Sequence, residues 1–299
     1  MRHWEFCCPI LDYSDDSGVL QAPVNLNQSM RIDLTPNWYQ TRSRSPGDFA
    51  FDHQDSREFG LAIVGQYDAE NSDSEPEARQ KELNDQILLV PFAFWCAQPS
   101  SFTGGRIVHY LISDDGSSIR TTRGARVIPL PSETSAIYGA DDVVKATKLF
   151  GVITALSRDG TLRAVIRMVH KALTESMWDV RFALHWVALE ALYGVSSKGE
   201  LRFRLSTHLA LFLGANEEER KALAKKAKGL YDIRSKIVHG LQYSGVTRDQ
   251  AVAYCGEVEV LVRSSLVKIL LGNDRETFDS RKRDEYFNAL IFRDRKCES

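Results

Sequence analysis

The sequence contains no long hydrophobic run. Across its 299 residues, no stretch approaches the ~20 consecutive apolar residues that a membrane-spanning helix needs. The first residues, MRHWEFCCPILDYSDDSG, lack an extended apolar core and soon become acidic, which is unlike a secretory signal peptide. We therefore expect a cytoplasmic protein that has no part in a membrane.

Cysteine is also sparse. The five cysteines include no CxxC pair and no Cys/His cluster with zinc spacing. This pattern predicts a reduced protein without a structural metal, and we expect no cofactor. The adjacent Cys7 and Cys8 favour packing within a strand over redox chemistry, because neighbouring cysteines rarely form a disulfide without strain.

An excess of positive charge is absent as well. The chain has 38 Lys and Arg against 40 Asp and Glu, a net charge of −2, so no overall basic field indicates a nucleic-acid-binding protein. Any contact with RNA would have to rest on a local patch. The apolar fraction of 43% and the charged fraction of 26% are those of a soluble globular protein, and the length allows one large domain or two ordinary ones.

The N-terminal part of the chain predicts strands joined by loops. Short apolar runs at 58–67 and 86–97 are separated by polar stretches. Residues 106–130 predict a β-hairpin, since the Asp-Asp-Gly at 114–116 tolerates the positive φ of a tight turn.

Two further stretches of this part, 43–57 and 69–85, have the composition of loops. The second is strongly acidic. It therefore predicts a solvated loop or a segment that binds a partner.

Beyond residue 140 the hydrophobic period changes to that of helices. Asn216, followed by Glu219, resembles a capping box at the start of one of them. Gly194, Gly214 and Gly240 each follow an apolar helical segment and suit a left-handed C-terminal cap. The predicted helices span 141–157, 161–175, 177–193, 199–213, 217–239 and 247–271, with one more beyond 275.

These two patterns predict an α+β fold, in which a β-rich N-terminal domain precedes an all-α helical bundle. The boundary falls between 130 and 140, around LPSETSAIYGADD. We expect a β-rich domain at 1–135 for sensing, regulation or substrate binding, a helical domain at 140–272, and a C-terminal helix and tail at 273–299.

The stretch LYDIRSKIVHG, residues 230–240, ends one predicted helix with an arginine and a histidine five positions apart. On a wheel with 100° per residue, one arc of this helix is apolar and faces the core, with Leu223, Leu230, Ile233 and Ile237. The neighbouring arc mixes apolar anchors with polar groups, namely Arg234, Val238, Tyr231, Ser235 and His239. The spacing alone is weak evidence for a site, because the helix dipole also favours cations near a C-terminus.

Three segments together resemble the HEPN superfamily, and in particular its Apea-like branch. They are WVALEALYG, LRFRLSTHLALFLG and YDIRSKIVHG, which end at Gly194, Gly214 and Gly240. The family motif is an arginine, a polar residue, three to five further residues and a histidine, which Arg234, Ser235 and His239 match. Many relatives have asparagine in place of the serine, which can still donate and accept a hydrogen bond. The resemblance covers 140–272 and not the β-rich part.

The resemblance implies a metal-independent endoribonuclease, in many relatives a toxin or an antiphage effector. Its implied partners are an RNA substrate, a second copy of the chain that pairs through the Arg234–His239 helix, and an antitoxin or an activating ligand or protein. The reaction would use the 2′-hydroxyl of RNA and leave a 2′,3′-cyclic phosphate and a 5′-hydroxyl. The implied catalytic residues are Arg234 and His239, with Ser235, Glu190, Tyr231 and Lys236 in support.

Glu190 lies among apolar residues in WVALEALYG, and a lone buried carboxylate is costly. Its side chain has three plausible positions: toward solvent, against Arg204, or beside Arg234. The family resemblance favours an inward role, because this glutamate belongs to the characteristic ALEAL helix.

The remaining polar features favour structural roles. His185 and His208 lie among apolar helical residues, which is typical of histidines in a core or an interface. The C-terminal segment from 281 interleaves acids with bases, which favours a solvated helix and tail over a contact with RNA phosphates. Two other functions stay open: a non-catalytic HEPN module for dimerisation, or an enzyme in the β-rich part, which shows no nucleophile–base pair or P-loop.

Overall fold

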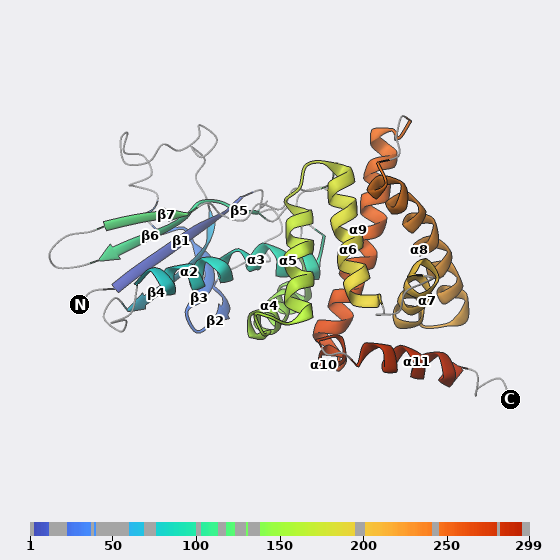
Figure 1. Cartoon of the computed structure of the whole chain (residues 1–299). Coiled ribbons are helices and arrows are strands. Elements are labelled where there is room, and N and C mark those ends of the chain that lie inside the picture. The colour runs from blue at the N-terminus through green and yellow to red at the C-terminus, as the bar shows by residue number, and fades with distance from the viewer. Residues whose placement is uncertain are drawn as a thin grey trace. The chain divides into compact units, whose positions relative to one another are not determined.

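The described residues of the computed structural model form two compact units (Figure 1). The first comprises 1–127 and 133–154, and the second comprises 128–132 and 155–299. An antiparallel sheet near the N-terminus is followed by a helical region, so the predicted α+β class is confirmed. The structure describes residues 3–11, 23–36, 39, 60–68, 76–99, 103–112, 118–122, 130, 138–194, 201–240, 245–279 and 282–294.

The first unit is built on an antiparallel sheet with the strand order β2-β3-β4-β1-β6-β7, in which β5 also pairs with β1. β1 is central, and its Phe6 lies opposite Gly65 of β4 and His109 of β6. The strands are β1 (His3–Leu11), β2 (Val24–Asn27), β3 (Met30–Leu34), β4 (Leu61–Asp68), β5 (Thr103–Gly104), β6 (Ile107–Ile112) and β7 (Ser118–Thr122). The helices are α2 (Pro76–Ile87), α3 (Leu89–Ala97) and α4 (Ala140–Ala155).

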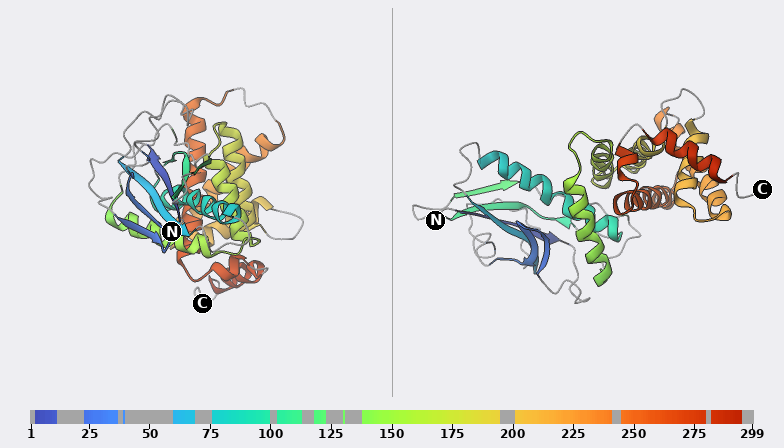
Figure 2. Two further views of the ribbon diagram at one scale, coloured as in Figure 1. Left: turned by 90° about the vertical axis from the view of Figure 1, so that its left-hand side faces the viewer. Right: turned by 90° about the horizontal axis from the view of Figure 1, so that it is seen from below.

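Both faces of β1 are buried, so that consecutive residues Phe6, Cys7 and Cys8 are all fully enclosed. The side of Phe6 also carries His109, whose Nε2 lies 2.8 Å from the Oδ1 of Asn84 in α2. α2 therefore covers this side of the sheet (Figure 2). The predicted packing of Cys7 and Cys8 in a strand is confirmed, and burial raises the pKa of the Cys8 thiol to about 12.

Two predictions for the first unit are wrong. The apolar run at 86–97 is not a strand, because it contains the last turn of α2 and all of α3, a helix whose residues are buried on every side. Most of the acidic stretch 69–85 is likewise not a loop, since α2 begins at Pro76. The predicted hairpin is confirmed by the pairing of β6 with β7, although its turn at 114–116 and the loop at 43–57 lie outside the described residues.

The second unit is a helical bundle centred on α6, which contacts α5, α7, α8 and α9. In Figure 1, α5, α6 and α9 run side by side, and α7 pairs with α8. The six predicted helices, the first of which is α4 of the first unit, are confirmed to within a few residues at each end. The helices are α5 (Thr161–Leu173), α6 (Trp178–Tyr193), α7 (Leu201–Leu213), α8 (Glu217–Val238), α9 (Arg248–Leu271), α10 (Arg275–Asp279) and α11 (Arg283–Asp294).

Polar contacts inside the bundle join α6 to α9. The Nε of Arg181 donates to the Oε1 of Glu259 at 2.6 Å, and both side chains are buried. Six residues further along α9, the hydroxyl of Tyr193 donates to Ser265 at 2.7 Å. Because buried polar groups are costly unless they are paired, these contacts fix how α6 lies against α9.

The C-terminal helices α10 and α11 each anchor one aromatic side chain in the bundle, while most described residues of α11 are exposed or half-buried, as expected for a solvated helix. Phe278 of α10 and Phe287 of α11 are buried. The Phe287 ring stacks on His208, with 4.3 Å between the ring centroids, and packs near Tyr193. Arg283 of α11 donates to the carbonyl oxygen of Ala191 at the end of α6.

Only one of the three glycine caps has the predicted conformation. Gly240 has φ of 65°, whereas Gly194 has φ of −69° and Gly214 is not left-handed. Glycine is needed at the last two positions because of close approach. A Cβ on Gly194 would overlap the Glu190 carbonyl oxygen, and one on Gly214 would lie 2.9 Å from the Arg220 nitrogen. The capping interaction predicted for α8 is confirmed, since Asn216 Oδ1 accepts from the Glu219 N–H at 2.9 Å.

No helix among the described residues has the length and apolar character needed to cross a membrane.

The packing of the sheet predicts a clear difference between two glycines. A Cβ on Gly65 would lie 2.6 Å from Phe6 Cζ and would overlap the carbonyl oxygen of Ser29, whereas a Cβ on Gly60 would meet nothing within 4 Å. We expect Gly65→Ala to lower the free energy of unfolding by about 1–3 kcal/mol, and Gly60→Ala to change it by less than about 0.5 kcal/mol. Urea denaturation followed by circular dichroism measures both. Equal effects of the two substitutions would contradict this packing.

Candidate functional site

The centre of the candidate site is an ion pair between α8 and α6. The Nη2 of Arg234 donates to the Oε2 of Glu190 at 3.0 Å and lies 2.9 Å from its Oε1. The two side chains are only 18% and 20% exposed. Among the described residues, the other N–H groups of the guanidinium, including the buried Nε, make no hydrogen bond, and the Oε1 of Glu190 is engaged only through this ion-pair contact. The pair is therefore fixed in position, and its guanidinium still has hydrogen-bond donors available.

One aromatic side chain lies beside the guanidinium, and a second one supports it. The Cζ of Arg234 lies 5.7 Å from the centre of the Tyr231 ring, in the range of a cation–π contact. Tyr231 in turn meets Trp186 edge to face, with 5.4 Å between the ring centroids. Trp186 and Glu190 are four residues apart on α6, and Tyr231 and Arg234 are three apart on α8, so each helix presents both groups on one face.

Burial changes the acid–base properties of this cluster. It raises the pKa of Glu190 above its ordinary value, and the charge and hydrogen bond of Arg234 oppose that rise only in part. Burial and the negative charge of Glu190 also raise the pKa of Tyr231, while Arg234 acts in the opposite direction. At neutral pH Tyr231 is therefore a neutral phenol, which can donate a hydrogen bond but does not act as a base.

His239 lies at the C-terminal cap of α8, where the helix ends before the left-handed Gly240. Its backbone N–H donates to the carbonyl oxygen of Ser235 at 3.1 Å. The imidazole is exposed and makes no hydrogen bond or ion pair with another described residue. It is thus accessible to a substrate or a partner. Ser235 is half-buried, and Lys236 is exposed.

The structure brings together some of the predicted site residues and leaves others apart. Arg234, Glu190 and Tyr231 form one contact cluster, and of the three positions considered for Glu190 the one beside Arg234 is observed. Ser235 and His239 are joined to each other through the backbone. The catalytic and supporting roles of these residues stay predictions.

Trp186 belongs to the cluster and was not predicted as a site residue. The signal was available, because a tryptophan four positions before Glu190 lies on the same face of a helix. The expectation of core histidines is confirmed for His185 and His208, which are both buried. The Nδ1 of His208 lies 3.1 Å from the carbonyl oxygen of Tyr193.

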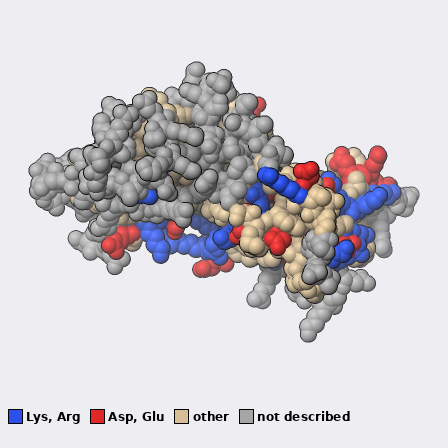
Figure 3. All heavy atoms as spheres, turned by 90° about the horizontal axis from the view of Figure 1, so that it is seen from above, with Lys and Arg blue, Asp and Glu red and all other residues tan. Residues whose placement is uncertain are grey.

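One face of the molecule carries charges of both signs. On the face drawn in Figure 3, the described Lys and Arg side chains lie among Asp and Glu side chains rather than in one continuous basic area. On this face, a contact with a nucleic acid would therefore rest on a few local groups. No group of three or more His, Cys, Asp or Glu among the described residues is arranged to hold a metal ion.

No family model, curated protein or solved structure matches this chain.

The burial of the Arg234–Glu190 pair predicts a measurable coupling energy. In a double-mutant cycle of Arg234→Met and Glu190→Gln, we expect the two residues to stabilise the fold jointly by about 1–3 kcal/mol, because hydrogen bonds to charged groups are stronger when shielded from water. The matched control is Arg202 with Asp232, which are 2.6 Å apart but both 51% exposed.

For that exposed pair, the cycle of Arg202→Met and Asp232→Asn should give less than about 1 kcal/mol. Urea denaturation of the four proteins in each cycle measures both values. A coupling at Arg234–Glu190 no larger than that of the control would show that the buried pair does not hold α8 against α6.

Proposed function

We propose that this protein is a metal-independent endoribonuclease of the HEPN type, with Arg234 and His239 as its catalytic residues. The observation that carries the proposal is the arrangement at the end of α8. A guanidinium is held by a carboxylate and an aromatic ring, and an imidazole with no partner among the described residues follows about one turn later at the helix terminus. This combination supplies a fixed cation for a phosphate and an accessible group for proton transfer.

The chemistry of RNA cleavage needs little more than these two groups, because the substrate carries its own nucleophile. His239 would take the proton of the 2′-hydroxyl as the 2′-oxygen attacks phosphorus. Arg234 would bind the non-bridging phosphate oxygens through the N–H groups that Glu190 does not occupy. The bond from phosphorus to the 5′-oxygen then breaks, and that oxygen receives a proton. The products are a 2′,3′-cyclic phosphate and a 5′-hydroxyl.

A homodimer would supply the second proton donor, since each chain contributes one His239. The surface beside the site supports such a contact. Val238 of α8 is 54% exposed, and Val187 of α6 is 38% exposed. On the helical wheel, Val238 lies about 40° from Arg234, and Val187 about 60° from Glu190. An apolar contact between two copies would thus place the two sites next to each other.

Supporting roles follow from the contacts. Glu190 would hold the guanidinium in place, and Tyr231 would shield it from water on one side. Ser235 and Lys236, on the same turns of α8, would contact the substrate backbone. A place among toxins or antiphage effectors, with an antitoxin or an activating ligand, rests on the family resemblance.

One observation favours a second function, a non-catalytic dimerisation module. Arg234 already has an ion-pair partner within its own chain, so the pair can be purely structural. In that case the β-rich unit would carry the activity. RNA cleavage by the purified protein and its site variants separates the two functions.

Purified protein is expected to cleave labelled RNA in the presence of EDTA and to leave 2′,3′-cyclic phosphate ends. Arg234→Ala and His239→Ala should each lower the rate at least about 100-fold, which is the size of effect expected for a phosphate-binding or proton-transfer group. Arg158→Ala, at an exposed arginine of the same unit, should cleave at the original rate. Cleavage that survives both site substitutions, or the lack of any cleavage by the original protein, would favour the dimerisation module.

The proposed dimer predicts that a charge at Val238 is disruptive. Val238→Asp should shift the protein from dimer to monomer in sedimentation velocity and lower the rate of RNA cleavage in parallel, because it places a carboxylate in an apolar contact. Val260→Asp in α9 is the matched control, since Val260 is 50% exposed and lies on another helix. A Val238→Asp monomer with full activity would rule out a shared site.

A further inference from the structure

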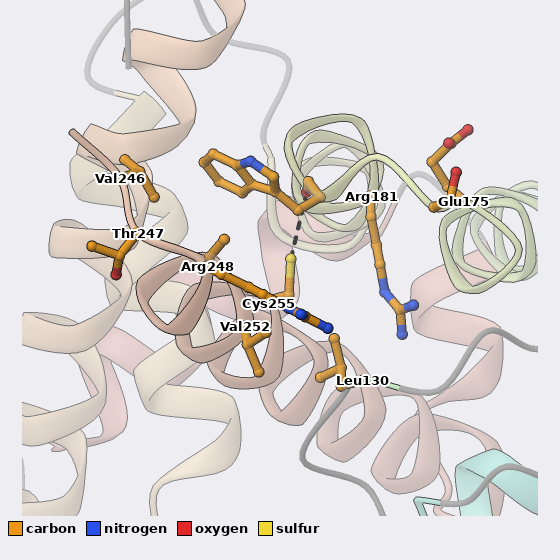
Figure 4. Close-up of a pocket in the computed structure, with 11 residues that line it drawn as sticks. Leu130, Glu175, Arg181, Val246, Thr247, Arg248, Val252 and Cys255 are labelled. Carbon is orange, nitrogen blue, oxygen red and sulfur yellow. Dashed lines mark hydrogen bonds between the residues drawn. The ribbon is translucent and has the colours of Figure 1, made fainter. Parts of the chain in front are cut away.

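A pocket of about 370 Å³ lies inside the helical unit, apart from the Arg234–Glu190 pair (Figure 4). It is bounded by the first turns of α6 and α9, by the turn between α5 and α6, and by the residues that precede α9. Leu130, which belongs to the helical unit, closes one side. Its volume is at the lower end of the range for pockets that bind small molecules.

Most of the pocket wall is apolar. The apolar side chains that line it are Leu130, Trp178, Val246, Ala251, Val252 and the thiol of Cys255. The Cys255 Sγ donates to the carbonyl oxygen of Trp178 at 3.4 Å. Burial raises the pKa of this thiol to about 12, so it stays protonated and does not act as a nucleophile. The pocket is therefore suited to non-covalent binding of an apolar body.

Three charged residues reach the pocket, and they differ in what they already bind. Arg181 is engaged by Glu259 at 2.6 Å. The carboxylate of Glu175 accepts the backbone N–H of Met177 at 3.1 Å, and in Figure 4 it points away from the two arginines. Arg248 makes no hydrogen bond or ion pair with another described residue.

The Arg248 side chain is also directed across the pocket. It extends from the first turn of α9 toward Leu130, and the guanidinium of Arg181 points to the same side (Figure 4). A guanidinium beside an apolar cavity is a specific donor for a carboxylate or a phosphate, whose oxygens accept two N–H groups at once. An apolar wall beside it would hold the rest of the ligand.

We propose that this pocket binds a small amphipathic anion, a molecule with an apolar body of aromatic or short-chain size and one carboxylate or phosphate that pairs with Arg248. The proposal does not depend on ribonuclease activity. The pocket lies at the N-terminal ends of α6 and α9 and contains none of the proposed catalytic residues. It assigns the helical unit a second, ligand-binding site.

Calorimetry on the full-length protein tests this with two probes of the same shape. Naphthalene-1-acetate carries the anion, and naphthalene-1-acetamide is its neutral counterpart. The original protein should bind the acetate with a Kd below about 1 mM and at least about tenfold more tightly than the acetamide, because a charge-assisted hydrogen bond distinguishes them.

Two substitutions locate the binding. Arg248→Met retains an unbranched apolar side chain but removes the charge, and it should weaken acetate binding at least about tenfold while leaving acetamide binding unchanged. Val252→Trp fills the cavity and should weaken both probes at least about tenfold. Arg275→Met is the matched control, an exposed arginine at the first position of α10, and should bind both probes like the original protein.

Circular dichroism checks that each variant is folded. The proposal is overturned if the original protein binds neither probe, or if it binds both equally. It is also overturned if the folded Arg248→Met protein binds the acetate as well as the original does, or if Val252→Trp has no effect on binding.

Discussion

The helical unit depends on how α6 accommodates charge inside an otherwise apolar helix. Arg181 near the start of α6 is buried, and Glu190 near its end is largely buried. Neither charged side chain has an ion-pair partner within α6 itself. Each therefore requires an opposite charge from a different helix, Glu259 of α9 and Arg234 of α8. Apolar packing alone tolerates small rotations of a helix, whereas a buried ion pair fails if either partner moves away. The two pairs thus set the position of α6 against both neighbours.

The candidate site follows from the second of these pairs. A guanidinium at the edge of a helix would ordinarily move among many rotamers, and fixing it on a ligand would cost conformational entropy. In this structure Glu190 and Tyr231 hold the Arg234 side chain before any ligand arrives. The cost of this arrangement falls on Glu190, because burial raises the pKa of its carboxyl and Arg234 compensates only in part. Charge placed at that cost in stability is typical of a site that needs a cation in a fixed position.

The sequence predicts the helical unit far better than the first unit, for physical reasons that individual residues illustrate. The helices of the bundle have one apolar face and recognisable caps, as at Asn216. The hydrophobic period and the capping residues therefore predict the same helix boundaries. α3 is buried all round and has no polar face from which a helical period can be recognised. The helical period of α2 is obscured for another reason: the polar Asn84 lies on the face toward the sheet, where it contacts His109. A polar residue that serves a partner distant in sequence interrupts the apolar stripe, and no local pattern reveals that partner.

Partners that are distant in sequence also explain why Arg234 could be predicted as a site residue and Arg248 could not. Sequence indicated Arg234 because a motif surrounds it, but it could not decide between Arg204 and Arg234 as the partner of Glu190, since that depends on how α7 and α8 pack on α6. Nothing local marks Arg248, which gains its significance from the cavity that Leu130, α6 and α9 form around it. The two differ in physical state as well: Arg234 is held before binding, whereas Arg248 has no partner among the described residues. A cation that is already fixed suits catalysis, because ordering its side chain in the transition state would add an entropic cost to the barrier of every turnover. A free one suits a ligand that orders it on arrival, with an affinity lowered by that ordering.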